Sequence, residues 1–341
     1  MSKMKNTVGN KTKISVLGAG SWGGTLAWLI SKKNKINLWT FSQDEYSKIK
    51  KTYSLIRPVK LKLNKNINIT TDLKSIVKNS EVLIIAVPSN AFEAVISKLK
   101  KLRISKKTIL LIATKGISNK NIRLSVLLKK QLKNNPFAVL SGPNIALDVI
   151  SKTPTISVIA SSNLKIALKL QEILSSDHFR IYINKDVTGV EIAGALKNVI
   201  AIAAGISDGL GFSISTKAAL ISRGLIEIAR ILIKEGGKEK TLLGAAGLGD
   251  LIATCCSTNS RNYKVGFQLA KGKKLTKILN DLGQVAEGVE TVKTMVKLGA
   301  KYKINLPIAN AVKNILFKGM KPKSVLKKLL SRPLPKYELE F

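Results

Sequence analysis

The sequence predicts an α/β domain built on a doubly wound, mainly parallel sheet, followed by an all-α domain. Short apolar runs alternate with helix-like segments as far as about Lys185, and strand signals nearly vanish beyond it. Long helical patterns fill the second half. A length of 341 residues suits two domains, which we place at 1–185 and 186–341.

Eight apolar runs in the first half are candidate strands. Most are rich in Ile, Val and Leu without strict alternation, which is typical of strands buried on both faces of a parallel sheet. Asp72 is placed to cap a following helix, and Asn90 with Glu93 has the spacing of a capping box. The candidate strands are 13–17, 36–40, 67–70, 81–87, 108–113, 137–141, 155–160 and 179–183.

The second half carries four long helical patterns. They cover 186–206, 215–234, 289–302 and 307–319. No flexible linker precedes them, so the two domains are expected to pack closely.

The chain is strongly basic, with a formal net charge of +38. A nucleic-acid surface would cluster this charge and add aromatic stacking residues, but aromatics make up only 5% and the lysines are scattered. Abundant Ile and Asn accompany the Lys, and all three have AT-rich codons. Compositional drift is therefore favoured, and no nucleic-acid partner is expected. The charge can still steer small anions toward the protein.

The sequence indicates a cytoplasmic protein without a metal. No apolar run reaches the ~18–20 residues of a membrane span, and the polar N-terminus lacks the apolar core of a signal peptide. Cys255 and Cys256 are adjacent, without C-x-x-C spacing, and are expected to be buried free thiols. His178 is the only histidine and is expected at the surface or in a loop, so acid–base chemistry falls to Lys, Asp or Glu.

A glycine-rich turn follows the first candidate strand directly. Gly18, Gly20 and Gly23 form G-x-G-x-x-G between a strand and a helix. The first glycine permits a tight turn, the second lets a pyrophosphate approach the backbone, and the third lets the helix pack on the strand. The motif predicts a Rossmann-type dinucleotide-binding domain.

The second candidate strand ends without the carboxylate that usually binds a ribose 2′-hydroxyl. Thr40, Phe41 and Ser42 stand there, while Asp44 and Glu45 come slightly later and open a helix. No Arg is present either. The choice between NAD and NADP therefore stays open at this point.

Over nearly its whole length the chain resembles the bacterial NAD(P)-dependent glycerol-3-phosphate dehydrogenases. That family interconverts dihydroxyacetone phosphate and sn-glycerol 3-phosphate, which feeds phospholipid synthesis. The resemblance also implies NAD(P)H, with NADPH slightly favoured, no metal, and compatibility with a homodimer. The motifs, in family order, are GAGSWGGTLA (18–27), VPS (87–89), ATKG (113–116), SGP (141–143), GALKNVIAIAAGISDGLGF (194–212), LISRG (220–224), AAGLGDLIATC (245–255), SRN (260–262) and QVAEG (284–288).

The resemblance implies a set of site residues. Lys197 would be catalytic, with Asp250 as its carboxylate partner. Substrate contacts would also include Lys115, Gly142, Asn144, Asn198, Thr254, Ser260, Arg261 and Asn262. Cofactor contacts would be Gly18, Gly20, Ser21, Trp22, Gly23, Phe41, Lys115, Ala146, Arg261, Val285 and Glu287.

Four departures from the family pattern concern the site. Asn144 replaces the usual Thr or Ser, and Asp148 a later Glu. Lys217 stands where relatives commonly carry Arg, which keeps the charge but loses the planar fork. Phe41 occupies a position that is often polar.

The local sequence gives each catalytic candidate a plainer alternative. Lys197 lies in an apolar helical stretch, where burial lowers a lysine pKa, but a snorkelling lysine fits the same pattern. Asp250 could orient Lys197 or cap a helix after Gly249. Ser260 or Asn262 could cap a helix aimed at a phosphate, or belong to a solvated turn.

Three rival functions remain open. The nearest is a related dehydrogenase with a Rossmann-type and a helical domain, acting on another hydroxy acid. The others are a basic nucleic-acid-binding protein and a dinucleotide sensor without turnover. The lysine together with the SRN segment favours a phosphorylated substrate.

Overall fold

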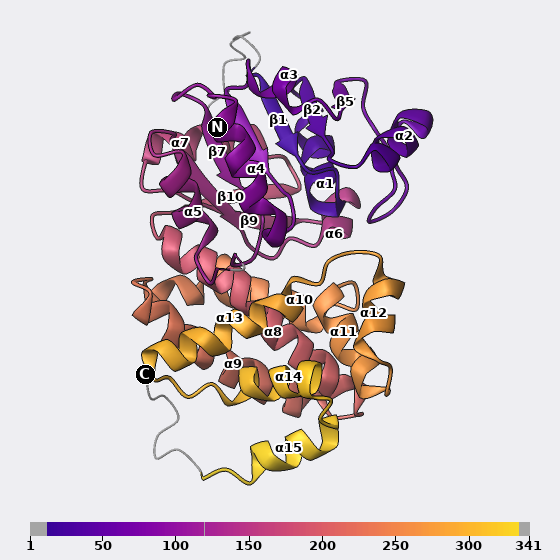
Figure 1. Ribbon diagram of the computed structural model, residues 1–341, viewed down its shortest axis with the longest axis vertical. Helices are drawn as coiled ribbons and strands as arrows, with labels where there is room; N and C mark the ends of the chain where they lie inside the picture. Colours follow the sequence, from indigo (N-terminus) through magenta and orange to yellow (C-terminus); the bar gives the residue numbers. More distant parts are fainter. Residues whose placement is uncertain (1–11, 119, 334–341) are drawn as a thin grey trace.

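The computed structural model describes residues 12–118 and 120–333. The polar N-terminal stretch discussed above lies almost wholly outside the described residues. Figure 1 shows an α/β half, drawn from indigo to magenta, above a helical half drawn from pink to yellow. The predicted fold class is confirmed.

One eight-stranded sheet forms the centre of the first half, in the order β10-β9-β8-β7-β6-β1-β2-β5. All neighbouring strands are parallel except β8 and β9, which pair antiparallel. Every candidate strand is confirmed, and a small antiparallel pair, β3 (Ser54–Leu55) with β4 (Leu61–Lys62), was not predicted because two residues carry no pattern. The sheet strands are β1 (Ile14–Leu17), β2 (Ile36–Trp39), β5 (Ile67–Thr70), β6 (Val82–Ile85), β7 (Ile109–Ile112), β8 (Phe137–Ser141), β9 (Thr155–Ala160) and β10 (Phe179–Asn184).

Helices cover both faces of this sheet. Successive residues along a strand point to opposite faces, so Val16 packs in one apolar core and Leu17 in the other. The first core includes residues of α1, α2, α6 and α7, and the second includes residues of α3, α4 and α5. These helices are α1 (Ser21–Ile30), α2 (Gln43–Thr52), α3 (Leu73–Val77), α4 (Ser89–Lys101), α5 (Leu124–Gln131), α6 (Ala146–Ile150) and α7 (Leu164–Leu174).

One of the two predicted helix caps is confirmed. The Asp72 side chain accepts the backbone N–H groups of Lys74 and Ser75 at the start of α3. The capping box at Asn90 is wrong, because α4 begins one residue earlier, at Ser89. The Ser89 N–H is accepted by the Glu287 carboxylate from the other half of the chain, so a distant residue replaces the local cap.

The second half is helical and packs around α8 (Val187–Gly209), as Figure 1 shows. Among the described residues, α8 alone is long and apolar enough to cross a membrane, but the whole apolar window is buried inside the protein. It is therefore the core helix. The other elements are α9 (Ile214–Lys234), a 3₁₀ turn (Glu239–Leu243), a π turn (Ala245–Gly249), α10 (Asp250–Cys256), α11 (Arg261–Ala270), α12 (Leu275–Leu282), α13 (Glu287–Tyr302), α14 (Pro307–Lys318) and α15 (Pro322–Leu330).

The cysteine prediction is half right. Cys255 is buried, whereas Cys256 is exposed, and both are free thiols. The two residues are consecutive in α10, so their side chains point in directions about 100° apart. His178 is half-buried in the turn before β10, as expected for a loop residue.

Helices α8 and α11 approach closely because a glycine on each helix faces the backbone of the other. A Cβ added to Gly266 would fall on the carbonyl oxygen of Ile202, and one added to Gly205 would fall on that of Tyr263. Both obstacles are backbone atoms, which cannot rotate away. The close contact positions Asn198 of α8 beside Asn262 of α11.

Gly266→Ala is therefore expected to lower the free energy of unfolding by about 3 kcal/mol, the upper end of ordinary overpacking costs. Urea denaturation of the full chain measures this effect. The matched control is Gln268→Ala on the same helix, expected to stay within about 0.5 kcal/mol. Equal stability of the two variants would contradict the close-packing argument.

Candidate active site

The glycine-rich turn connects β1 to α1. Gly18 has φ +113°, and a Cβ there would lie 2.7 Å from the carbonyl oxygen of Ala86. A Cβ at Gly23 would fall on the carbonyl oxygen of Gly18, so only glycine lets α1 start so close to β1. A Cβ at Gly20 would meet nothing within 4 Å, which leaves open space before the first N–H groups of α1. This cradle fits a pyrophosphate.

The turn opens into a cleft of about 950 Å³ lined by residues of both halves. Three predicted residues, Gly23, Gly142 and Asp250, are not among its lining residues. The predicted residues that line the cleft are Gly18, Gly20, Ser21, Trp22, Phe41, Lys115, Asn144, Ala146, Lys197, Asn198, Thr254, Ser260, Arg261, Asn262, Val285 and Glu287.

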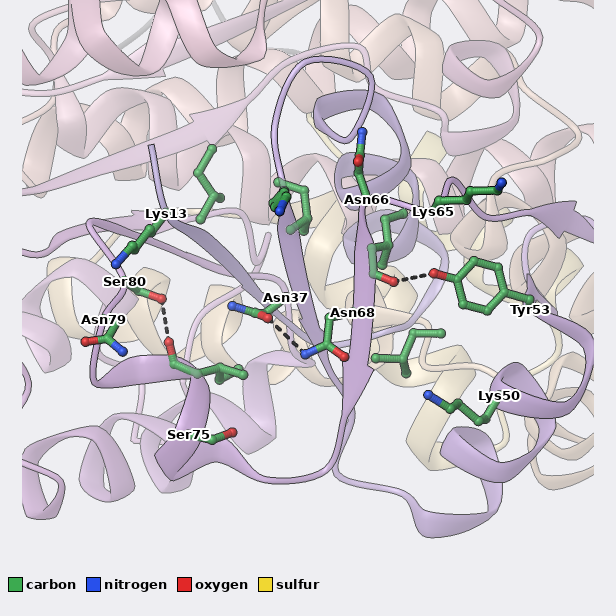
Figure 2. Close-up of a pocket in the computed structure, with 16 residues that line it drawn as sticks. Lys13, Asn37, Lys50, Tyr53, Lys65, Asn66, Asn68, Ser75, Asn79 and Ser80 are labelled. Atoms are coloured by element: carbon green, nitrogen blue, oxygen red, sulfur yellow. Dashed lines mark hydrogen bonds between the residues drawn. The ribbon is translucent and has the colours of Figure 1, made fainter. Parts of the chain in front are cut away.

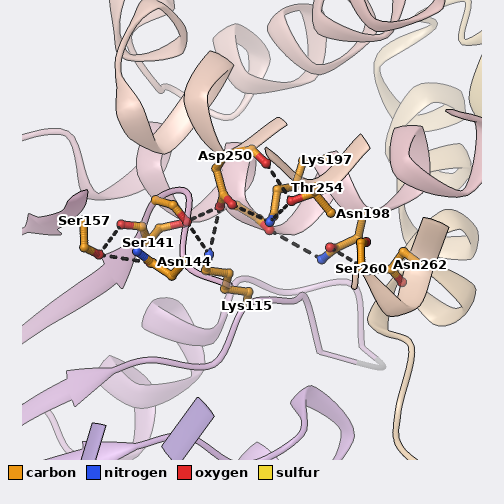
Figure 3. Close-up of polar contacts among 12 residues, drawn as sticks. Lys115, Ser141, Asn144, Ser157, Lys197, Asn198, Asp250, Thr254, Ser260 and Asn262 are labelled. Carbon is orange, nitrogen blue, oxygen red and sulfur yellow. Dashed lines mark hydrogen bonds and ion pairs between the residues drawn. The ribbon is translucent and has the colours of Figure 1, made fainter. Parts of the chain in front are cut away.

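Two lysines share the Asp250 carboxylate in the wall of this cleft (Figure 3). Lys197 Nζ, from α8, donates to Asp250 Oδ1 at 2.5 Å and to Thr254 Oγ1 at 2.5 Å. Lys115 Nζ, from the loop after β7, donates to Asp250 Oδ2 at 2.9 Å and to the Gly142 carbonyl oxygen at 2.7 Å. Asp250 is 1% exposed and Lys197 5%. The cluster thus holds two cations and one anion with little access to water.

The pKa of Lys115 is lowered to about 8, chiefly by burial and also by the Lys197 charge. The Asp250 carboxylate opposes both effects and raises that pKa. A lysine with a pKa near neutrality can exchange a proton at physiological pH, so this cluster can bind an anion and also move a proton.

The SRN segment begins α11 beside this cluster. The Ser260 hydroxyl caps α11 by accepting the Tyr263 N–H at 3.3 Å, so one of its two predicted roles is confirmed. Asn262 does not cap the helix. Its Nδ2 donates to Asn198 Oδ1 of α8 at 2.8 Å, and its Oδ1 accepts the Gly288 N–H of α13 at 2.9 Å, so α8 and α13 each supply one partner.

Arg261 lies in the same wall and is half-buried. Burial lowers its pKa, while the nearby Glu287 carboxylate raises it. Burial also raises the pKa of Glu287, and Ser89 opposes this by donating to it through its N–H and its hydroxyl. Arg261 therefore presents a desolvated, planar set of donors, which suits a phosphate.

Two residues that depart from the family pattern are bonded away from the lysine cluster. Asn144 Nδ2 donates to the Ile156 carbonyl oxygen at 2.9 Å, and its Oδ1 accepts the Ser157 hydroxyl at 3.0 Å. Lys217 pairs with Asp208 at 2.5 Å and does not line the cleft. Asp250 follows Gly249 in the first turn of α10 but makes no cap hydrogen bond with its side chain.

Several residues of the cleft and of the lysine cluster were not predicted. Ser141 donates to Asp250 Oδ2 at 3.4 Å, and Gln284 Oε1 accepts the Ser21 hydroxyl at 2.8 Å across the cleft. Glu45, Arg57 and Lys98 also line the cleft, and of these Glu45 and Lys98 lie near Phe41. Ser141 lies in the SGP motif and Gln284 in the QVAEG motif, which offered a signal, whereas Glu45, Arg57 and Lys98 lie outside the motifs.

A second cavity, of about 580 Å³, lies beside β1, β2 and β5 at the edge of the sheet (Figure 2). Asn37 Nδ2 donates to Ser15 Oγ at 3.3 Å, and Asn68 Nδ2 to Asn37 Oδ1 at 3.1 Å. These side chains satisfy one another, and exposed lysines at the rim are expected in so basic a chain. We assign no ligand to this cavity. The rim lysines are Lys13, Lys35, Lys50 and Lys65.

The nucleotide cradle, the buried lysine cluster and the helical second half together define a Rossmann-type, nicotinamide-dependent dehydrogenase. Comparison with known proteins identifies the family of dehydrogenases. Residues 13–167 match the N-terminal part of the NAD-dependent glycerol-3-phosphate dehydrogenases, and residues 186–327 match the C-terminal part. The chain belongs to this family.

Individual relatives agree with this assignment. The chain is 44% identical to glycerol-3-phosphate dehydrogenase [NAD(P)+] of Thermoanaerobacter sp., covering 96% of this chain and 99% of that protein. It is 39% identical to the Bacillus subtilis protein of the same name, covering 94% of each. The crystal structure of glycerol-3-phosphate dehydrogenase from Coxiella burnetii has a TM-score of 0.91 and 37% identity, covering 94% of this chain and 99% of that one.

Proposed function

We propose that this protein interconverts dihydroxyacetone phosphate and sn-glycerol 3-phosphate with NAD(P)H, supplying glycerol 3-phosphate for phospholipid synthesis. The observation that carries the proposal is the buried Lys197–Asp250–Lys115 cluster beside a nucleotide cradle, in a chain of this family. The relatives do not favour the alternative substrate, another hydroxy acid.

Lys197 acts as the proton donor. When bound, the nicotinamide supplies a hydride to the substrate carbonyl carbon. As the carbonyl oxygen gains charge, Lys197 gives it a proton, and the bond to Asp250 Oδ1 keeps the ammonium group in position. Lys115 adds a second positive charge in the same low-dielectric wall, which stabilises the developing alkoxide.

The substrate phosphate is bound at the start of α11. Arg261 supplies charged donors, and the N-terminus of α11, capped by Ser260, faces the same region of the cleft. Asn198, Asn262 and Thr254 hold the substrate hydroxyl and carbonyl groups. The cofactor contacts are the predicted set from Gly18 to Glu287 that lines the cleft.

Finer points belong to the same proposal. We place the domain boundary near Lys185, between β10 and α8. We propose a cytoplasmic homodimer without a nucleic-acid partner. We also propose that the enzyme uses no metal, since two ammonium groups supply the charge that a metal would supply elsewhere. We further propose a slight preference for NADPH over NADH, supported by the positive charge of Lys98 over Phe41 in the cleft.

The decisive experiment follows reduced-nicotinamide absorbance with the purified full chain. Addition of dihydroxyacetone phosphate is expected to cause absorbance loss with both NADPH and NADH. Unphosphorylated dihydroxyacetone is the control and is expected to react far more slowly, because it leaves Arg261 without an anion. Equal rates with the two substrates, or no reaction in a folded protein that binds nucleotide, would refute the proposed substrate.

A further inference from the structure

The end of β2 carries opposite charges instead of a single recognition residue. In Rossmann-type domains this end faces the adenosine ribose, where NADH has a 2′-hydroxyl and NADPH a 2′-phosphate. Here Thr40 and Phe41 follow the strand directly, and the charges come from elsewhere in the chain. Lys98 is supplied by α4 and Glu45 by the first turn of α2.

Lys98 places a positive charge over Phe41. Its Nζ lies 4.9 Å from the centroid of the Phe41 ring, and both residues line the cleft. Phe41 is 77% exposed, so its ring offers a face to a ligand. The Lys98 ammonium group lies on the same side of the cleft as the ring. The ion pairs within 4 Å among the described residues engage other cations, so the Lys98 charge is not neutralised by a carboxylate.

Glu45 places a negative charge at the same strand end. Its Oε2 accepts the Thr40 hydroxyl at 2.5 Å, and Thr40 is only 2% exposed, so the carboxylate is anchored to β2. This bond uses one carboxylate oxygen, and the other can accept a hydrogen bond from a hydroxyl group. A carboxylate attracts a 2′-hydroxyl and repels a 2′-phosphate.

We propose that Lys98 binds the 2′-phosphate of NADPH while Glu45 accepts the 2′-hydroxyl of NADH, so that the two opposed charges keep the cofactor preference small. The inference deepens the proposed function, since it rests on a nicotinamide cofactor in this cleft. Arg57 is another cation that lines the cleft, but its Nη1 donates to the Gly283 carbonyl oxygen at 2.7 Å. It fastens the segment before Glu287 and leaves the 2′ position to Lys98.

The test uses ligands that lack the nicotinamide. Calorimetry on the full chain compares adenosine 2′,5′-bisphosphate with adenosine 5′-monophosphate, which differ by the 2′-phosphate alone. Lys98→Met keeps the aliphatic contact with Phe41 and is expected to reduce the advantage of the bisphosphate about tenfold, the value of one charge-assisted hydrogen bond. Glu45→Gln is expected to increase that advantage. The same variants should shift the NADPH-to-NADH ratio of kcat/KM in the same two directions.

Lys100→Met is the matched control, because Lys100 is exposed on the same helix and does not line the cleft. It should leave the ratio of the two affinities as in the wild type. The proposal would be overturned if Lys98→Met weakened the binding of both ligands equally. It would also be overturned if Arg57→Met, and not Lys98→Met, selectively weakened the binding of the bisphosphate. Binding is measured without substrate, so the two proposals can fail separately. Absence of turnover with dihydroxyacetone phosphate would refute the proposed function, whereas the ratio of the affinities for the bisphosphate and the monophosphate decides the role of Lys98.

Discussion

Lys197→Ala is expected to lower kcat with dihydroxyacetone phosphate by about 10²–10⁴-fold, the range for loss of a positioned proton donor. The Lys197 ammonium group is 2.5 Å from both Asp250 and Thr254, so it is fixed in place before substrate arrives. No other described lysine bonds to Asp250 Oδ1 and Thr254 in its stead. Stopped-flow measurement of a single turnover isolates this chemical step from product release.

The fold and the cofactor site are expected to survive this substitution. Lys115 remains paired with Asp250 at 2.9 Å, so the carboxylate does not become a buried charge without a partner. Lys234→Ala, an exposed lysine on the neighbouring α9, serves as the control and should retain full turnover. Turnover near the wild-type rate in Lys197→Ala, with NADH binding intact, would refute the assignment of the proton donor.

Asp250→Asn is expected to impair both stability and catalysis. The substitution keeps the shape of the side chain but leaves Lys115 and Lys197 facing each other without an anion. Removing one partner of a buried ion pair costs about 3–5 kcal/mol, and urea denaturation should reveal a loss of that order. The kcat is expected to fall about 10²-fold or more, because Lys197 loses the group that holds it in position.

The pH profile separates this positioning effect from simple destabilisation. Lys115 has a pKa of about 8, and Asp250 is the group that raises it. Protonated Lys115 predominates below this pKa and is lost as the pH rises through it, so wild-type kcat/KM should decline above about pH 8. In Asp250→Asn the decline should begin at lower pH. Serine substitution of exposed Cys256 is the control, and an unchanged profile in Asp250→Asn would contradict the shared-carboxylate cluster.

The sequence alone determined the strands and the nucleotide turn. Buried parallel strands need continuous apolar runs, so strands β6 (82–85) and β7 (109–112) could be predicted without a structure. The glycine motif could also be recognised from the sequence, because the positive φ at Gly18 and the backbone contact at Gly23 exclude any larger residue. Local rules also predicted the Asp72 cap, because its partners lie two and three residues away.

Tertiary structure decided what depends on residues far apart in the chain. The start of α4 is set by Glu287, 198 residues from Ser89, so a local capping rule could not find it. The pairing of Lys115 with Asp250 spans 135 residues, and the Lys98 charge reaches Phe41 from another helix. A sequence pattern records which face of an element is apolar, but only the packing of those faces brings distant charges together. The shared carboxylate and the charges at the end of β2 therefore became visible only in the folded protein.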